Sequence, residues 1–378
     1  MAGSETRSLE LRRLGRAGPN AGEMELLRAA TLDLEPATAA WRRWLDAHDI
    51  DEAYHRSTDL LPAISANLPP DVLADEAGRL RGIRRRVWAD NQFGFAALVE
   101  VAKVLEAEGI EPVVVKGAAL STTVYTEPGT RAMADVDLLI GTDKFGAACD
   151  ALFASGWKRL DPVEGPFFHA VAVIDDLGRN VDVHKWVAFP RFSPVPERTW
   201  LQRAVPHTLR GHELHRLASS DELVLSVLHG MLTNSSSATR WPIDVVQLAR
   251  MAPVIEAGFW DAVVASATEV QAGPIVGDAL AMCRTDLGAD IDLDVIEQLA
   301  ATPLDRGAAQ HWALCRSGIT LEWRMRRYAR LERSEGRKPT VRGYVQPRTQ
   351  AIRTRGMSSV LGGRVERVKQ IVADRTRN

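Results

Sequence analysis

Acidic residues at alternating positions inside apolar segments constrain this chain more than any other feature of its sequence. Asp135 and Asp137 alternate with apolar residues in AMADVDLLI. Asp182 and His184 do the same in NVDVHKW. This alternation is typical of β-strands, in which residues two apart share one face. Because carboxylates in a buried strand are costly unless they are compensated, the pattern predicts two strands whose acidic side chains share a positive partner.

Magnesium is the partner that best suits these carboxylates, since it prefers hard oxygen ligands and keeps room for substrate phosphates. Three carboxylates on adjacent strands can hold two metal ions in the arrangement used for phosphoryl transfer. We therefore predict Asp135, Asp137 and Asp182 as catalytic residues and as ligands of two Mg²⁺ ions, with Mn²⁺ as an alternative. A DxD pair alone is common in solvated turns, so the prediction depends on the ordered set of motifs.

The segment VVVKGAALS has the composition expected of a phosphate-binding element. Gly117 lets the backbone approach phosphates closely, and the following helical stretch presents free N–H groups. Lys116 and Arg131 are the candidate cationic partners of these phosphates. His184 shares the face of Asp182, and it is expected either to contact the nucleotide or to hydrogen-bond Asp182.

Hydrophobic periodicity predicts an α+β fold with an α/β core between two helical regions. Thr142 is expected to cap a helix over residues 144–154, which Gly156 ends. Residues 175–179 (DDLGR) have the composition of a hairpin turn. Further helices are expected at 24–32, 37–48, 81–108 and after about 219, and strands at 113–115, 136–140, 167–174 and 180–187.

These elements predict five regions along the chain. They are a flexible leader (1–22), an N-terminal helical region (23–108), the α/β core (109–215), a C-terminal helical domain (216–333) and a basic, mobile tail (334–378). From residue 321 onward sixteen Lys and Arg stand against five Asp and Glu, although the whole chain has a net charge of only −2. The tail either binds nucleic acid or an acidic partner, or is a solvated terminus.

Composition places the chain among ordinary globular proteins, with 46% hydrophobic and 25% charged residues. No uninterrupted apolar run is long enough to span a membrane, and no signal peptide is recognisable at the start. Three scattered cysteines form no CxxC pattern, which fits a reducing compartment. We therefore expect a cytoplasmic protein with no membrane partner.

Three segments together resemble a bacterial family of uncharacterised nucleotidyltransferases. They are KGAALSTTVYTEPGTRAMADVDLLI, NVDVHKW, and DELVLSVLHGM followed by RWPIDVVQL. The resemblance implies a fold like that of DNA polymerase beta, with a mixed sheet flanked by helices, a divalent metal and an NTP donor. Gly117 is followed by Ala118, where most members of the wider superfamily have Ser or Gly. Ser121, one turn later, is therefore the candidate hydroxyl for nucleotide binding.

The function expected is transfer of a nucleoside monophosphate from an NTP, with ATP favoured, to an acceptor hydroxyl or phosphate. A small-molecule or peptide acceptor is favoured over nucleic acid, because the core has no basic channel. One alternative is a toxin-like transferase that modifies tRNA or a protein, and another is a catalytically silent nucleotide-binding scaffold. His229 and Asp244 are expected either to form a buried contact between helices or to act in catalysis.

Overall fold

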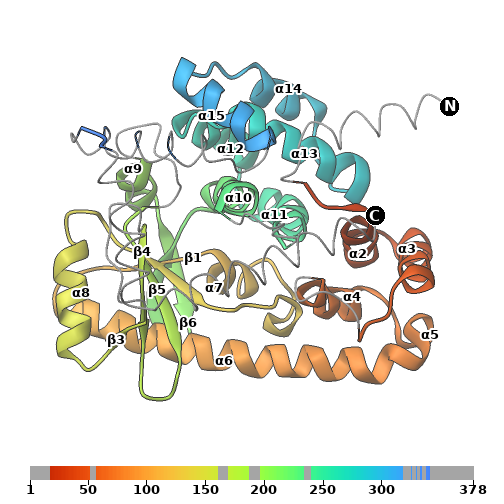
Figure 1. Cartoon of the computed structure of the whole chain (residues 1–378), viewed down its shortest axis with the longest axis horizontal. Helices are drawn as coiled ribbons and strands as arrows, with labels where there is room; N and C mark the ends of the chain where they lie inside the picture. Colours follow the sequence, from red (N-terminus) through yellow and green to blue (C-terminus); the bar gives the residue numbers. More distant parts are fainter. Residues whose placement is uncertain are drawn as a thin grey trace.

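The computed structural model describes residues 18–51, 57–160, 169–186, 196–233 and 240–317, together with 325, 329, 333 and 338–340. Within these residues one seven-stranded mixed sheet lies among many helices (Figure 1). The predicted α+β class is therefore confirmed. The predicted leader lies largely outside the described residues, and the basic tail almost entirely so. The division of the chain into five regions stays a prediction.

The sheet has the strand order β3–β4–β5–β2–β1–β7–β6. β2 runs parallel to β5 and β1 runs parallel to β7, whereas the other neighbours are antiparallel. The strands are β1 (Val113–Val115), β2 (Val136–Leu139), β3 (Lys158–Arg159), β4 (Ala170–Ile174), β5 (Asn180–His184), β6 (Val205–Leu209) and β7 (His212–Arg216). The middle of the sheet is thus built by the strands that carry the acidic motifs.

Helices precede, interrupt and follow the sheet. Before it come α2 (Ala21–Thr31), α3 (Leu34–Ala47), η2 (Thr58–Leu60), α4 (Leu61–Asn67), α5 (Pro70–Leu73), η3 (Ala74–Glu76) and α6 (Ala77–Ala107). Between strands lie α7 (Lys116–Ser121), η4 (Pro128–Thr130), α8 (Phe145–Ala154) and α9 (Pro196–Gln202). After it follow α10 (Ser219–Leu228), the π-helical turn η5 (His229–Thr233), α11 (Trp241–Ile255), α12 (Phe259–Glu269), α13 (Gly273–Leu287), α14 (Leu293–Ala301) and α15 (Arg306–Ser317).

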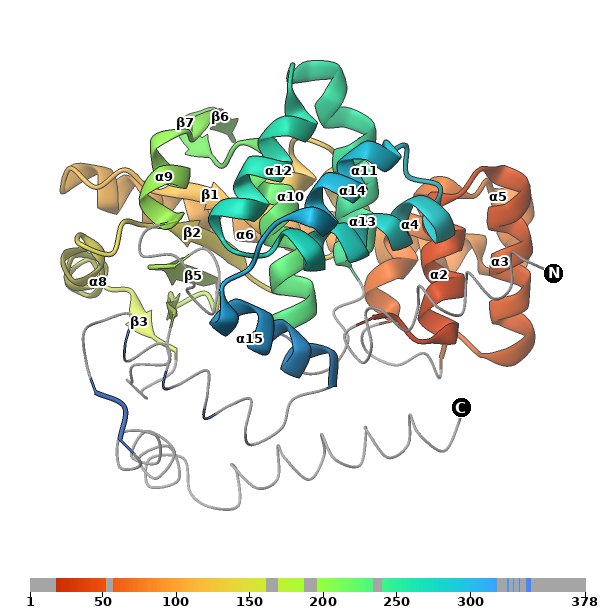
Figure 2. The same ribbon diagram turned by 90° about the horizontal axis from the view of Figure 1, so that it is seen from above.

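Side-chain alternation in β1 shows how the sheet separates two apolar cores. Val114 packs with buried residues of α6 and α8, whereas Val113 and Val115 pack with residues of α10 and α11. The long helix α6 runs along one side of the sheet, and α10 and α11 lie on the other (Figure 1). Seen from above, α10 to α14 gather between the sheet and α2 to α5 (Figure 2). Residues that face away from α6 therefore point towards α7 and the C-terminal helices.

Most of the predicted elements are present, with shifted ends. The turn over residues 175–179 is confirmed, because Asp175 accepts hydrogen bonds from the backbone N–H groups of Leu177 and Arg179. The helix after Gly141 ends before Gly156 as expected, but Thr142 does not cap it. Its hydroxyl donates instead to the carbonyl of Lys185 at 3.1 Å, which ties the end of β2 to the end of β5.

The hairpin of β6 and β7 was not predicted from the sequence. Its strands are joined by Arg210 and Gly211, which both have positive φ, at 52° and 76°. Two such residues form the tight turn that matches the twist of a hairpin. The Arg-Gly pair between VPHTL and HELHR was the available signal, and the polar residues in both strands obscured it.

We expect Gly211→Ala to destabilise the protein by about 1 kcal/mol, because an added Cβ disfavours the left-handed backbone of this turn. Gly146→Ala is the matched control, since Gly146 is exposed within α8 and nothing lies within 4 Å of an added Cβ. The control is expected to be neutral or to stabilise by up to about 1 kcal/mol. Urea denaturation measures both, and equal effects of the two substitutions would contradict the assigned turn.

Candidate active site

The centre of the site is a pair of aspartates in register on neighbouring strands. Asp137 of β2 and Asp182 of β5 are direct partners in the parallel pair. Their neighbours Val136, Val181 and Val183 face the core that contains α6. The pleat therefore turns both carboxylates to the opposite face, towards the C-terminal helices. The structure thus brings together the two motifs that the sequence places 45 residues apart.

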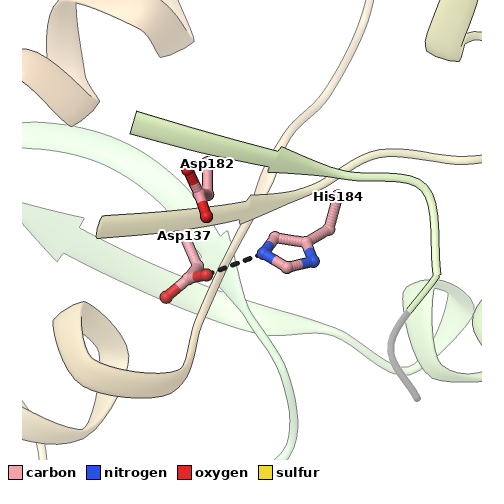
Figure 3. Close-up of side chains that lie close together, drawn as sticks. All are labelled: Asp137, Asp182 and His184. Carbon is pink, nitrogen blue, oxygen red and sulfur yellow. Dashed lines mark hydrogen bonds and ion pairs between the residues drawn. The ribbon is translucent and has the colours of Figure 1, made fainter. Parts of the chain in front are cut away.

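His184 completes a group of three possible metal ligands with these aspartates (Figure 3). One ligand atom from each of the three side chains lies within 4.8 Å of the others. The Nε2 atom of His184 is 2.7 Å from Oδ1 of Asp137. Burial, followed by the nearby ammonium of Lys116, lowers the pKa of His184. The imidazole is therefore neutral near pH 7, which is the form that binds metals.

Asp182 is the member of this group that lacks a compensating partner. Its Oδ1 atom is buried and has no hydrogen-bond partner among the described residues. Burial, and then the negative charges of Asp137 and Asp135, raise the pKa of Asp182 to about 7. A buried carboxylate oxygen without a donor, beside a second carboxylate, fits a place for a cation. The side chains present therefore fit the divalent metal predicted from the sequence.

Asp135 lies just before β2 and is half-buried. The negative charge of Asp137, followed by burial, raises the pKa of Asp135. The three predicted aspartates therefore lie close enough to oppose one another's ionisation. Asp135 and Asp137 also border a cavity beside the sheet, where a ligand can approach their carboxylates.

Lys116 supplies the positive charge nearest to these carboxylates. Its Nζ atom lies 2.6 Å from Oδ1 of Asp137 and 3.1 Å from Nε2 of His184. Burial would raise the pKa of Asp137, but the Lys116 ammonium and the His184 hydrogen bond outweigh it and hold that pKa well below its usual range. Lys116 also has a left-handed backbone at φ 56°, which is uncommon for a residue other than glycine.

Glu222 of α10 holds the backbone of Lys116 in this conformation. The Lys116 N–H donates to both carboxylate oxygens of Glu222, at 2.9 and 3.1 Å. Glu222 is 1% exposed, and its burial raises the pKa of its carboxyl group to about 8. The role of Glu222 was not predicted from the sequence. An acidic residue inside the apolar helical segment DELVLSVL was the available signal.

Gly117 and Arg131, both predicted to bind nucleotide, are in direct contact. A Cβ on Gly117 would lie 2.4 Å from Nη1 of Arg131, so only glycine leaves room for the guanidinium. The Nε and Nη2 atoms of Arg131 donate to the two carboxylate oxygens of Asp244 at 2.7 and 2.8 Å. The hydroxyl of Tyr125, which the sequence analysis did not select, donates to the same carboxylate at 2.6 Å. Asp244 thereby fastens α11 to the segment before β2.

The cavity beside Asp135 lies between the sheet and the C-terminal helices. From the sheet side it is lined by Lys116, Gly117, Arg131, Met133, Asp135 and Asp137. From the helical side it is lined by Ser226, His229, Gly230, Arg240, Trp241 and Asp244. Ser121 is not in its lining, because this side chain is fully buried and its hydroxyl donates to the carbonyl of Ala118 at 3.4 Å.

The helical wall of the cavity contains His229 and Asp244, for which the sequence allowed either a structural or a catalytic role. His229 and Asp244 both line the cavity, but no hydrogen bond joins them among the described residues, since Asp244 bonds to Arg131 and Tyr125. His229 opens the π-helical turn η5, a feature frequent at functional sites. In that turn a Cβ on Gly230 would lie 2.1 Å from the Trp241 ring, so the glycine allows η5 to pack directly on α11.

Comparison with known proteins assigns this chain to a family. Residues 53–288 match the model of the family described as uncharacterised nucleotidyltransferase. The match covers more than half of the chain and includes the whole sheet and every residue of the site, so the chain belongs to this family of nucleotidyltransferases. The resemblance inferred from the sequence is confirmed at this level. The bacterial origin and the wider polymerase beta-like superfamily stay predictions.

Curated proteins and solved structures do not refine this family assignment. No curated protein matches the chain. The crystal structure of an antigenic nucleotidyltransferase-like protein from Paracoccidioides brasiliensis is similar, with 14% sequence identity and a TM-score of 0.31. The match covers 53% of this chain and 95% of that protein. Among the described residues, no helix combines the length and apolar character needed to cross a membrane.

We expect Asp244→Ala to destabilise the protein by about 3–5 kcal/mol, because it leaves the buried guanidinium of Arg131 without its carboxylate. The double substitution Arg131→Met/Asp244→Leu is expected to cost less than the sum of its two single substitutions, since it removes both charges together. Chemical denaturation of the native protein, Arg131→Met, Asp244→Leu and the double variant completes the cycle, and Asp244→Ala is measured beside them. A loss below about 1 kcal/mol in Asp244→Ala would contradict a structural role for this pair.

Glu222 is expected to make stability fall as pH rises from about 4.5 to about 8. Below this range both states are protonated, and within it the unfolded state loses the Glu222 proton while the folded state, with a pKa of about 8, keeps it. The free energy of unfolding therefore falls by up to roughly 1.4 kcal/mol per pH unit from this group. Glu222→Gln should lack this part of the slope in urea titrations at several pH values. Parallel pH profiles for the two proteins would contradict the assignment.

Proposed function

We propose that this nucleotidyltransferase moves a nucleoside monophosphate from an NTP, with ATP favoured, to an acceptor hydroxyl or phosphate and releases pyrophosphate. The observation that carries the proposal is the register pairing of Asp137 with Asp182, next to Asp135 at the edge of the cavity. Such a group of mutually repelling carboxylates needs a cation. Phosphoryl transfer in a site of this kind depends mainly on positioning and on compensation of phosphate charge.

The metal would be held by Asp135, Asp137 and Asp182, with His184 as a further candidate ligand. The support is the clustering of three of these side chains and the unpaired Oδ1 atom of Asp182. Magnesium, or manganese in its place, would neutralise negative charge on the donor phosphates. His184 also has a role without metal, since its ring positions the Asp137 carboxylate through the hydrogen bond at 2.7 Å.

The donor phosphates would lie where the cations of the cavity converge. Lys116, Arg131 and Arg240 all border the cavity. Arg131 is preorganised, because Asp244 fixes its plane and leaves Nη1 beside Gly117. Arg240 is fixed as well, since its Nη1 atom donates to the carbonyl of Ala132 at 2.7 Å. Preorganised cations stabilise phosphate charge without first having to be ordered.

The acceptor proposed is a small molecule or a peptide. The cavity lies within one chain between sheet and helices, and both walls carry polar side chains that can orient a compact ligand. The toxin-like alternative, with tRNA or a protein as acceptor, depends on the basic tail, which lies almost entirely outside the described residues. The silent-scaffold alternative has support in the Lys116–Asp137 ion pair, because a lysine that permanently neutralised Asp137 would make a metal unnecessary.

The test is calorimetric titration of ATP, CTP, GTP and UTP with and without Mg²⁺. We expect Mg²⁺-dependent binding of at least one nucleotide by the native protein, and binding at least about tenfold weaker in Asp137→Asn and Asp182→Asn, because each loses a metal-binding charge. Asp176→Asn is the matched control, since this aspartate lies in the β4–β5 turn with a side chain 83% exposed. It should bind as the native protein does.

Pyrophosphate release distinguishes the alternatives once a nucleotide is bound. Release with small hydroxyl or phosphate acceptors, lost in Asp137→Asn, supports the proposed reaction. Release only with tRNA or with a protein favours the toxin-like transferase. Nucleotide binding that neither Mg²⁺ nor the two aspartate substitutions alter would contradict metal-dependent transfer and favour the scaffold.

A further inference from the structure

The ammonium group of Lys116 lies beside two side chains that a metal ion at this site would also use as ligands. It lies 2.6 Å from Oδ1 of Asp137 and 3.1 Å from Nε2 of His184. These two side chains belong to the group of three that could hold a metal ion. The lysine therefore acts as an internal cation for this site, and its side chain is only 12% exposed.

Lys116 and a metal ion compete for the side chains of Asp137 and His184, so each weakens the binding of the other. A divalent ion bound by Asp137 and His184 would lie within a few ångströms of the ammonium, and two cations at that distance repel strongly in a buried setting. Each also needs the lone pairs of the Asp137 carboxylate. Metal binding must therefore include the cost of separating Lys116 from Asp137.

Lys116 already lies at the edge of the cavity. Lys116 borders the cavity together with Arg131 and Arg240, where it can join their positive charge. Its backbone is held in the left-handed conformation by the two hydrogen bonds to Glu222. Rotation about the flexible side-chain bonds therefore suffices to move the ammonium, with the backbone unchanged.

We propose that Lys116 exchanges partners during ligand binding. Without metal it neutralises Asp137, and when a divalent ion binds, its ammonium turns into the cavity and meets the donor phosphates. This inference rests on the proposed metal-dependent function and assigns Lys116 two successive roles. Because metal and nucleotide both favour the turned lysine, each should increase the affinity for the other, by the same factor.

The experiment measures Mn²⁺ binding in the absence of nucleotide, from the electron paramagnetic resonance signal of free Mn²⁺. We expect Lys116→Met to bind Mn²⁺ about tenfold or more tightly than the native protein, because no ion pair has to be broken. In contrast, it should bind the Mn²⁺ complex of a non-hydrolysable ATP analogue about tenfold more weakly, because a phosphate contact is lost. Partner exchange predicts that the affinity for Mn²⁺ rises in this variant while the affinity for the Mn²⁺–nucleotide complex falls.

Lys158→Met is the matched control for the loss of one positive charge. Lys158 forms an ion pair with Asp176 and is 67% exposed, far along the sheet from Asp137. It should leave both affinities unchanged. Asp137→Asn serves as the control for site identity, since Mn²⁺ binding at this site should be lost in it.

The outcomes separate this inference from the proposed function. If the native protein binds Mn²⁺, Asp137→Asn does not, and Lys116→Met binds no more tightly, the exchange is wrong while the metal site stands. If neither the native protein nor Lys116→Met binds Mn²⁺, both ideas fail. Should Lys116→Met be unfolded without metal, exchange predicts that Mn²⁺ restores folding in a thermal melt, and no restoration would overturn it.

Discussion

The parallel pairing of β2 with β5 places two carboxylates side by side on one face of the sheet, and the arrangement around the site depends on this constraint. Asp137 and Asp182 are register partners, so their charges cannot separate without breaking the sheet. Burial strengthens the repulsion between the two carboxylates, because water cannot screen their charges. The surrounding residues either neutralise Asp137, as Lys116 does, or leave a buried oxygen without a donor, as at Oδ1 of Asp182.

A second set of buried polar contacts joins the sheet to the C-terminal helices. Glu222 holds the Lys116 backbone, and Asp244 holds Arg131 against Gly117. In both cases an acidic residue of a helix fixes a cationic residue next to the site. The ion pair of Asp244 with Arg131 is bidentate, so it sets the plane of the guanidinium as well as its position. Asp244 thereby fixes the direction of the Arg131 guanidinium at the edge of the cavity, whereas Glu222 fixes the backbone of Lys116 and not its ammonium group.

The sequence and the structure agree best where local pattern determines the outcome. The strand assignment of the two acidic motifs followed from alternation alone, and the register then brought Asp137 and Asp182 together. Local sequence pattern was not sufficient to place Thr142, Ser121 and the β6–β7 hairpin. The Thr142 hydroxyl bonds across to Lys185 instead of capping its own helix, and Ser121 is turned into the core. The hairpin carries polar residues in its strands, which weakened its signal.

The sequence by itself determined the α+β class, the strand positions of the acidic motifs and membership of a nucleotidyltransferase family, because these depend on residue order over short distances. Only the tertiary structure decided the partners of the cations. Lys116 with Asp137, Glu222 with Lys116, and Asp244 with Arg131 each join residues from 21 to 113 positions apart. No local periodicity encodes such pairs, since their formation depends on how helices pack on the sheet.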